Sequence, residues 1–194
     1  MTRVVLASAS PRRVELLQLL LASFECCPVN IDETPLEGER PAIYVERLAR
    51  EKAIACPSND ALVLAADTTV TLDGVILGKP DNRADAKKIL MTLSGREHQV
   101  LTAVAARYEG RLDTVVVTTR VEFAVLDQPL IERYLDTHEP WDKAGAYGIQ
   151  GYAGSFVRQI SGNYSAVVGL PLLEVRELLA RFSVFPEWPV VADG

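Results

Sequence analysis

The chain lacks the sequence features that mark secreted and membrane proteins. Among its 194 residues are three cysteines, Cys26, Cys27 and Cys56, whose spacing gives neither a CxxC pair nor a regular disulfide framework. No stretch approaches the ~20 apolar residues of a membrane span, and the apolar run from Val4 to Ala7 is too short for the core of a signal peptide. These absences predict a protein of a reducing compartment, the cytoplasm, that does not act at a membrane.

Positive charge and histidine are also scarce. Lys and Arg total 20 against 26 Asp and Glu, which gives a formal net charge of −6 and a pI near 5.0. Because nucleic acids and anionic membranes attract basic surfaces, this balance argues against a nucleic acid polymer as partner. His98 and His138 are isolated and offer no zinc-binding spacing, so both are expected to be surface or structural residues. Any cluster of cations is therefore expected to be local.

Strand-like and helix-like patterns alternate along the chain, which favours an α/β fold. Strands are expected in RVVLA, FECCPV, ALVLAA, HQVLTAVAARY and LDTVVVTTRVEFAV, with hairpin turns at Asp73-Gly74 and Glu109-Gly110. Helices are expected from Pro11 with Ser10 as N-cap, over about residues 42–56, after Asn82, over about residues 129–138 with Asp127 as cap, and around Val175, Leu178, Leu179 and Phe182. The stretch VRQISGNYSAVVGL is expected to return to strand, and the tail from Ser183 shows no clear pattern.

No internal repeat, low-complexity tract or long linker divides the sequence. The expectation is therefore a single domain over residues 1–194. If the chain has a second, smaller lobe, the candidate is about residues 126–164, packed against the rest.

The stretch LASASPRR places two arginines at the start of a predicted helix. Free backbone N–H groups and the positive end of the helix dipole meet there, so the position suits an anion. With their two guanidinium groups, Arg12 and Arg13 would complete a clamp for phosphate. The alternative is that both point to solvent or pair with Glu15 or Glu33.

Lys52 falls on the apolar stripe of the helix expected over residues 42–56. It follows Val45 by seven residues and Leu48 by four, which puts all three on one face. A lysine there needs a partner. Lys52→Met is expected to preserve or raise thermal stability, because it removes a desolvated charge, and still to cripple catalysis.

Asp67 directly follows the apolar run ALVLAA, at the strand end where open α/β sheets place their ligands. Alternatively, it caps the following hairpin through Thr68 or Thr69. Glu33 in a polar loop and Lys79 in GKP add a second carboxylate and another cation. Since Mg²⁺ takes carboxylate oxygens together with substrate phosphates and water, this set favours metal-assisted phosphate chemistry.

Signatures of other nucleotide sites and of hydrolases are absent or weak. GKP lacks the upstream glycines and the following Ser or Thr of a Walker A loop, and GIQGYAG has neither the spacing nor the position of a dinucleotide fingerprint. No serine lies in a G-x-S-x-G elbow.

Seven stretches match one known family in the family's own order. They are LASASPRR, DETP, RLAREKA, AADTTV, GKP, HEPWDKAGAYGIQG and VVGLPL, spread from Val5 to about Leu179. On these motifs the chain resembles the Maf family of nucleoside triphosphate pyrophosphatases. The resemblance implies a mixed twisted sheet with flanking helices, two lobes with a cleft between them, and a homodimer. It also implies a divalent cation, Mg²⁺ or Mn²⁺, and hydrolysis of a nucleoside triphosphate to the monophosphate and pyrophosphate.

The resemblance also implies roles for individual residues. Carried over by motif, the phosphate and metal site consists of Ser8, Arg13, Glu33, Lys52, Asp67 and Lys79. Asp67 would be the proton acceptor, assisted by Lys52 and Lys79. Glu33 and Asp67 would hold the metal.

Three further positions are similar to the branch of the family that acts on dTTP and UTP. They are Arg12, Thr68 and Gln150. A Gln amide pairs with the donor and acceptor edge of a pyrimidine, and a hydrogen-bonding pocket rejects analogues that leave it unpaired.

Three alternatives stay open at this point. A nucleotide-binding regulator of cell division would use the same clamp without significant turnover. Binding of structured RNA would require an extended basic surface. Hydrolysis of a phosphate monoester would release single phosphate instead of pyrophosphate.

Overall fold

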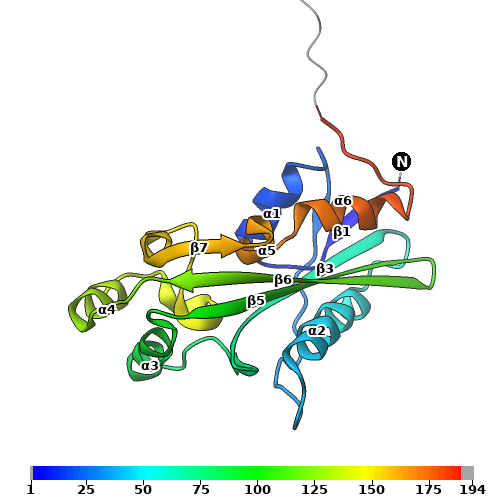
Figure 1. The fold of residues 1–194 in the computed structure, drawn as a ribbon. Coiled ribbons are helices and arrows are strands. Elements are labelled where there is room, and N and C mark those ends of the chain that lie inside the picture. Colours follow the sequence, from blue (N-terminus) through cyan, green and yellow to red (C-terminus); the bar gives the residue numbers. More distant parts are fainter. Residues whose placement is uncertain (1, 189–194) are drawn as a thin grey trace, which may run out of the picture.

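The computed structural model describes residues 2–188, which build one seven-stranded sheet with helices on both faces (Figure 1). The strands are β1 (Val4–Leu6), β2 (Glu25–Cys26), β3 (Leu62–Leu72), β4 (Val75–Leu77), β5 (Glu97–Tyr108), β6 (Arg111–Phe123) and β7 (Val157–Ser161). The α-helices are α1 (Pro11–Gln18), α2 (Pro41–Ala55), α3 (Arg83–Leu93), α4 (Gln128–Leu135), α5 (Tyr164–Val168) and α6 (Leu172–Ala180). Three short 3₁₀ turns, η1 (Pro140–Asp142), η2 (Ala144–Ala146) and η3 (Tyr152–Phe156), lie between α4 and β7, in residues 136–156, here called the glycine-rich stretch.

The sheet is mixed, as predicted. Its strands run in the order β2-β1-β3-β5-β6-β7, and β4 pairs with β3. Strand β1 is parallel to β2 and β3, whereas the other pairings are antiparallel. The predicted fold class, α/β with a mixed sheet and flanking helices, is confirmed.

Strand β3 reads as a continuous apolar run because the sheet is covered on both faces there. Leu62 and Leu64 pack against α1 and α6, whereas Val63 and Ala65, which alternate with them along the strand, pack against α2. Figure 1 shows α2 on one side of the central strands and α1, α5 and α6 on the other. A third apolar cluster joins α3 and α4 to the far end of the sheet.

Strand β3 does not end at Asp67, which corrects the prediction from the apolar run. It continues to Leu72, because β5 pairs with it from Val63 to Thr71. On its other edge, Ala7 N donates to Leu64 O at 2.8 Å, and β4 begins to pair only at Val70. Within the described chain, Asp67 therefore lies in the gap between β1 and β4, beyond the carboxyl end of β1.

Most of the predicted helix caps and hairpin turns are present. The caps at Asn82 and Asp127 are confirmed, since their side chains accept from Asp85 N and Leu130 N. Both hairpin turns are also confirmed, and each has two consecutive residues of positive φ, as a type I′ turn requires. Ser10 occupies the N-cap position of α1, but its side chain makes no capping bond.

Part of the expected strand VRQISGNYSAVVGL is a helix. Only β7 is extended there, and α5 follows because the Asn163 side chain accepts from Ala166 N at 3.2 Å and caps a new helix. Helix α5 packs on β5 and β6, and its Ala166 and Val168 are buried as part of a helix, not of a strand. Helix α6 ends at Ala180, so Phe182 packs against the core from beyond it.

No helix in residues 2–188 is long and apolar enough to cross a membrane. The last six residues of the patternless tail, 189–194, lie outside the described residues. The smaller lobe over about residues 126–164 stays a prediction.

Candidate active site

A cleft of about 910 Å³ opens at the gap between β1 and β4. The start of α1, the loop after β2, α2, β3, the loop after β4 and the glycine-rich stretch all border it. Eight of the nine predicted site residues line it: Arg12, Arg13, Glu33, Lys52, Asp67, Thr68, Lys79 and Gln150. The ninth, Ser8, is buried behind them and accepts from the Arg13 guanidinium at 3.4 Å.

Lys52 joins the two carboxylates of the site. Its Nζ lies 2.6 Å from Asp67 Oδ1 and 2.6 Å from Glu33 Oε1. Helix α2 carries Lys52 on its buried face, and β3 presents Asp67 toward that helix. The partner that the apolar stripe requires is therefore supplied by two elements distant in sequence, and Asp67 does not act as a hairpin cap.

The two carboxylates differ in their environment. Burial raises the pKa of Asp67, and the charges of Lys52 and Arg13 only partly offset the rise. For Glu33, burial acts in the same direction but is outweighed by Lys52 and Lys79, so the pKa of Glu33 lies below its usual value. The ionised form of Glu33 is thus favoured, while the pKa of Asp67 lies above its usual value.

Arg13 is held by neutral oxygens alone. Its guanidinium donates to Gly169 O at 2.9 Å, to Ser8 Oγ at 3.4 Å and to Thr68 Oγ1 at 3.3 Å. It forms no ion pair with Glu15, Glu33 or any other carboxylate in residues 2–188, and burial lowers its pKa. A half-buried guanidinium without a direct ion pair can receive an anion.

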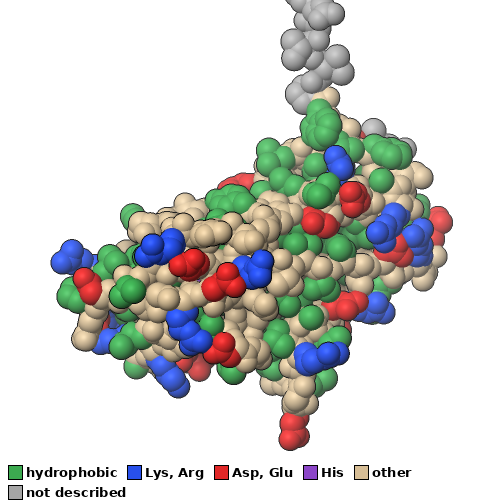
Figure 2. Space-filling view, in the orientation of Figure 1, with side chains coloured by type: hydrophobic (Ala, Val, Ile, Leu, Met, Phe, Trp, Pro, Cys, Tyr) green, Lys and Arg blue, Asp and Glu red, His purple; other side chains and the backbone are tan. Residues whose placement is uncertain are grey.

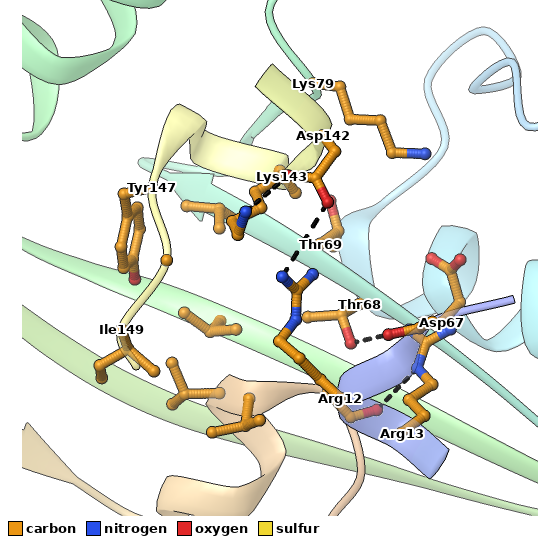
Figure 3. Close-up of a pocket in the computed structure, with 18 of the residues that line it drawn as sticks. Arg12, Arg13, Asp67, Thr68, Thr69, Lys79, Asp142, Lys143, Tyr147 and Ile149 are labelled. Atoms are coloured by element: carbon orange, nitrogen blue, oxygen red, sulfur yellow. Dashed lines mark hydrogen bonds and ion pairs between the residues drawn. The ribbon is translucent and has the colours of Figure 1, made fainter. Parts of the chain in front are cut away.

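Arg12 and Lys79 are more loosely placed at the rim of the cleft. Arg12 Nη1 lies 4.0 Å from Asp142 Oδ2, and in Figure 3 it reaches toward that carboxylate. Lys79 Nζ lies 3.6 Å from Glu33 Oε2, and its side chain is 62% exposed. Both cations are free to move toward a bound ligand, because such weak exposed contacts contribute little.

The cleft has a charged end and an apolar end. Figure 3 places Asp67, Arg13 and Lys79 on one side and Tyr147 and Ile149 on the other. Val100, Val167 and Val168 add further apolar lining. Gln150 follows Ile149, is exposed in the cleft, and makes no side-chain hydrogen bond within the described residues. Its amide is available to a ligand.

Several residues that shape the cleft were not predicted. Glu139 accepts from Tyr152 N at 2.7 Å and from Ala153 N at 3.1 Å, which fixes the loop that carries Gln150. Tyr44 donates to Glu33 O at 2.9 Å and holds the loop of that carboxylate. No periodic pattern marks either residue. Membership of Glu139 in the stretch HEPWDKAGAYGIQG was the one available signal.

His98 is a structural residue, as predicted. It is 2% exposed, and its Nε2 lies 2.8 Å from the hydroxyl of Tyr147, which lines the cleft. Burial lowers the pKa of His98 to about 4, so the ring is neutral near pH 7. His138 is exposed.

The donor set fits a hard divalent cation that keeps part of its coordination for substrate. No group of three or more His, Cys, Asp and Glu side chains gathers as a metal site in residues 2–188. Glu33 and Asp67 each offer a carboxylate within 2.6 Å of Lys52 Nζ. Mg²⁺ is commonly held by one or two carboxylates together with phosphate oxygens and water, so two protein ligands suffice.

Sequence comparison relates the chain to one family of known proteins. The family model described as Maf-like protein matches residues 3–182, which include all nine predicted site residues. The dTTP/UTP pyrophosphatase of Yersinia pestis bv. Antiqua (strain Antiqua) is 50% identical over 185 residues, covering 94% of each chain. That of Methylobacillus flagellatus is 48% identical over 188 residues, covering 95% of this chain and 94% of the relative. That of Vibrio cholerae serotype O1 is 48% identical over 184 residues, with 93% and 98% covered. The chain belongs to the Maf family.

Proposed function

We propose that the chain hydrolyses dTTP and UTP between the α and β phosphates, releasing the monophosphate and pyrophosphate. Relatives bearing that activity in their names match nearly the whole chain at about half identity. The observation that carries the proposal is Arg13, a half-buried cation held by neutral oxygens beside the carboxylate pair of Asp67 and Glu33. An anionic substrate supplies the direct ion-pair partner that Arg13 lacks within the described residues.

The cations bind and neutralise the triphosphate. Arg13 offers fixed donors beside Asp67, and Arg12 and Lys79 close in from the rim. Lys52 contributes charge at the bond that breaks, because it is tied to the carboxylate next to that bond. Preorganised charge of this kind stabilises the negative charge that grows on the leaving pyrophosphate.

Asp67 accepts a proton from the attacking water. Its raised pKa makes it a better base than an exposed carboxylate, while Lys52 favours its ionised form. Lys52 Nζ also orients the carboxylate, so one oxygen stays directed into the cleft. Ser8 acts indirectly by holding Arg13.

A divalent cation, Mg²⁺ or Mn²⁺, would be held by Glu33 and Asp67. Such an ion supplies neutralisation of phosphate oxygens and lowers the pKa of a bound water. The low pKa of Glu33 keeps that ligand ionised.

The base is recognised at the apolar end of the cleft. Tyr147 and Ile149 provide apolar contact, and the free amide of Gln150 pairs with the polar edge of a pyrimidine. Arg12 and Thr68 lie between this end and the charged end and complete the recognition.

The experiment is a panel of nucleoside triphosphates assayed for pyrophosphate with and without Mg²⁺. We expect dTTP and UTP to give the highest kcat/KM, pyrophosphate to be the product, and chelation of the metal to stop turnover. Binding without turnover would favour the regulator of cell division, and release of single phosphate would favour a phosphatase. A purine preference would contradict the proposed substrate.

RNA binding is disfavoured by the distribution of charge. On the face shown in Figure 2, Lys and Arg are interspersed with Asp and Glu and form no continuous basic stripe. Ion pairs such as those of Arg83 with Glu132 and Asp136 consume much of the exposed positive charge. RNA binding requires net positive surface along its path.

We propose that the enzyme works in the cytoplasm as a homodimer. All three cysteines are free thiols, with Cys56 buried, which suits a reducing compartment. Analytical ultracentrifugation would test the assembly, and a monomer at micromolar concentration would contradict it.

A further inference from the structure

The proposed function leaves open how the cleft distinguishes uracil and thymine from cytosine. These bases have nearly the same shape but opposite polarity at N3, which is an N–H donor in uracil and thymine and an acceptor in cytosine. The Gln150 amide carries donor and acceptor on a rotatable group, and here it is unrestrained within the described residues. By rotating, it pairs with either base. Discrimination therefore needs a group of fixed polarity.

Thr68 is a cleft residue whose hydroxyl polarity is fixed by its neighbours. It is the one residue of β3 that is not buried, and Figure 3 places it between the charged end and the apolar end. Its direct partner across the sheet is Thr102 of β5, and the two hydroxyl oxygens lie 2.9 Å apart. One of the two must donate to the other.

The proton of Thr102 is already committed elsewhere. Thr102 is fully buried, and its hydroxyl donates to Ala166 O at 2.7 Å. That carbonyl lies in the last turn of α5, and Leu170 N, which would extend the helix to it, bonds to Ser165 O instead. Because terminal helix carbonyls need an outside donor when buried, Thr102 cannot release its proton.

Thr68 must consequently donate to Thr102. A hydroxyl has a single proton, so none remains for a ligand. Arg13 Nη2 donates to Thr68 Oγ1 at 3.3 Å, which uses one of the two acceptor positions. What Thr68 presents to the cleft is one free acceptor.

We infer that Thr102 is a positioning residue that fixes Thr68 as an acceptor, and that the cleft thereby prefers a base with an N–H donor, uracil or thymine, over cytosine. This inference rests on the proposed pyrimidine specificity. A uracil N3–H donates to Thr68, whereas the N3 of cytosine meets a second lone pair and is repelled. The order of the relay is Arg13 to Thr68 to Thr102 to Ala166 O.

The test measures kcat/KM for UTP and CTP with Mg²⁺ in the full chain. Thr102→Val frees the Thr68 proton, so we expect CTP hydrolysis to rise and the ratio of UTP to CTP to fall about tenfold. Thr102→Ser keeps the relay and should keep the ratio. Thr68→Val removes both the acceptor for uracil and the repulsion of cytosine. We therefore expect kcat/KM for UTP to fall about tenfold and kcat/KM for CTP not to fall.

The matched control is Thr119→Val. Thr119 is also fully buried, and its hydroxyl donates to Asn163 O at 3.1 Å just before α5, but it does not reach Thr68. It should lower the melting temperature as Thr102→Val does and leave the ratio unchanged. If Thr102→Val does not fold, the change in kcat/KM for UTP and CTP in Thr68→Val is the test of the inference.

Two results would overturn the inference while sparing the proposed function. One is a parent enzyme that hydrolyses dTTP, UTP and CTP equally well. The other is equal loss of UTP and CTP hydrolysis in Thr68→Val, with no gain of CTP hydrolysis in a folded Thr102→Val. A parent that fails on both dTTP and UTP would overturn the proposed function and the inference together.

Discussion

The Nζ of Lys52 lies 2.6 Å from Oδ1 of Asp67, deep beside the sheet, where both side chains are about nine-tenths buried. Helix α2 and strand β3 pack closely enough to force the two charges together. The same ammonium also reaches Glu33, which is more exposed. Lys52 thus links both carboxylates of the candidate site to helix α2.

Asp67→Asn tests the proposed catalytic role of Asp67 apart from its contribution to folding. The amide keeps the shape of the side chain but neither accepts the proton nor carries the charge, so we expect kcat to fall by roughly 100-fold or more. The melting temperature should change little, because Lys52 retains Glu33 as a partner. The control is Asp32→Asn, which removes a neighbouring carboxylate that does not contact Lys52. Activity of Asp67→Asn within a few-fold of the parent would remove Asp67 from its role as proton acceptor.

Lys52→Met is now expected to destabilise the protein. The sequence suggested the opposite, because a lysine on an apolar stripe looks like an unpaired charge. Its ion pair with Asp67 changes that expectation: the substitution leaves a buried carboxylate without a partner, at a cost of about 3–5 kcal/mol near pH 7.

The pH dependence of Lys52→Met gives a second readout. Without the ammonium, the folded-state pKa of Asp67 rises further above its unfolded value. Stability is then fully present at low pH and is lost as pH rises through the folded pKa. The double variant Lys52→Met/Asp67→Asn should recover most of the loss in chemical denaturation. If the single variant is as stable as the parent at pH 7, the ion pair does not contribute.

The parts of the fold that follow periodic patterns were predictable from the sequence. The burial of Lys52 followed from 3.6-residue spacing, and the long strands β5 and β6 followed from their β-branched runs and glycine turns. The extent of β3 could not be predicted from the sequence, because pairing with β5 holds Thr69 and Thr71 in the strand despite their polarity.

The contacts that complete the site depend on packing between distant segments. Thr102 reads as one polar residue within an apolar strand, and nothing local shows that its hydroxyl meets Ala166 O. Likewise, Glu139 becomes an anchor only because the chain returns to it at Tyr152 and Ala153. Motif resemblance indicated the candidate site residues, but tertiary structure was required to find the residues that hold them in place.

Gln150→Ala and Arg13→Ala should lose activity toward different sets of nucleotides. In the proposed site Gln150 pairs with the base, so Gln150→Ala should reduce kcat/KM for dTTP and UTP by about 1–3 kcal/mol and affect ATP and GTP much less. In the proposed site Arg13 binds the phosphates shared by all nucleotides, so Arg13→Ala should lower kcat/KM for all four substrates together. Measuring kcat/KM for these four nucleotides in both variants checks the division. A uniform loss in Gln150→Ala would exclude it from base recognition.

His98 should make the protein less stable in mild acid. Its pKa in the folded state is about 4, because burial disfavours the charged ring, whereas the ordinary value is 6.5. Between these values the unfolded chain binds a proton that the folded chain does not. The free energy of unfolding therefore falls as pH drops from 6.5 toward 4, by on the order of 3 kcal/mol from this group.

Urea denaturation of His98→Gln between pH 7 and pH 4 checks this expectation. Glutamine does not titrate and can still bond to the Tyr147 hydroxyl, so the pH dependence should flatten over that range. His138→Gln removes an exposed histidine and serves as the matched control, since it keeps the contribution of carboxylates such as Glu33, whose lowered pKa also costs stability in acid. Because Tyr147 lines the cleft, protonation of His98 should also loosen the base-binding end before the sheet unfolds. An acid dependence as steep in His98→Gln as in His138→Gln would show that the buried imidazole does not titrate as inferred.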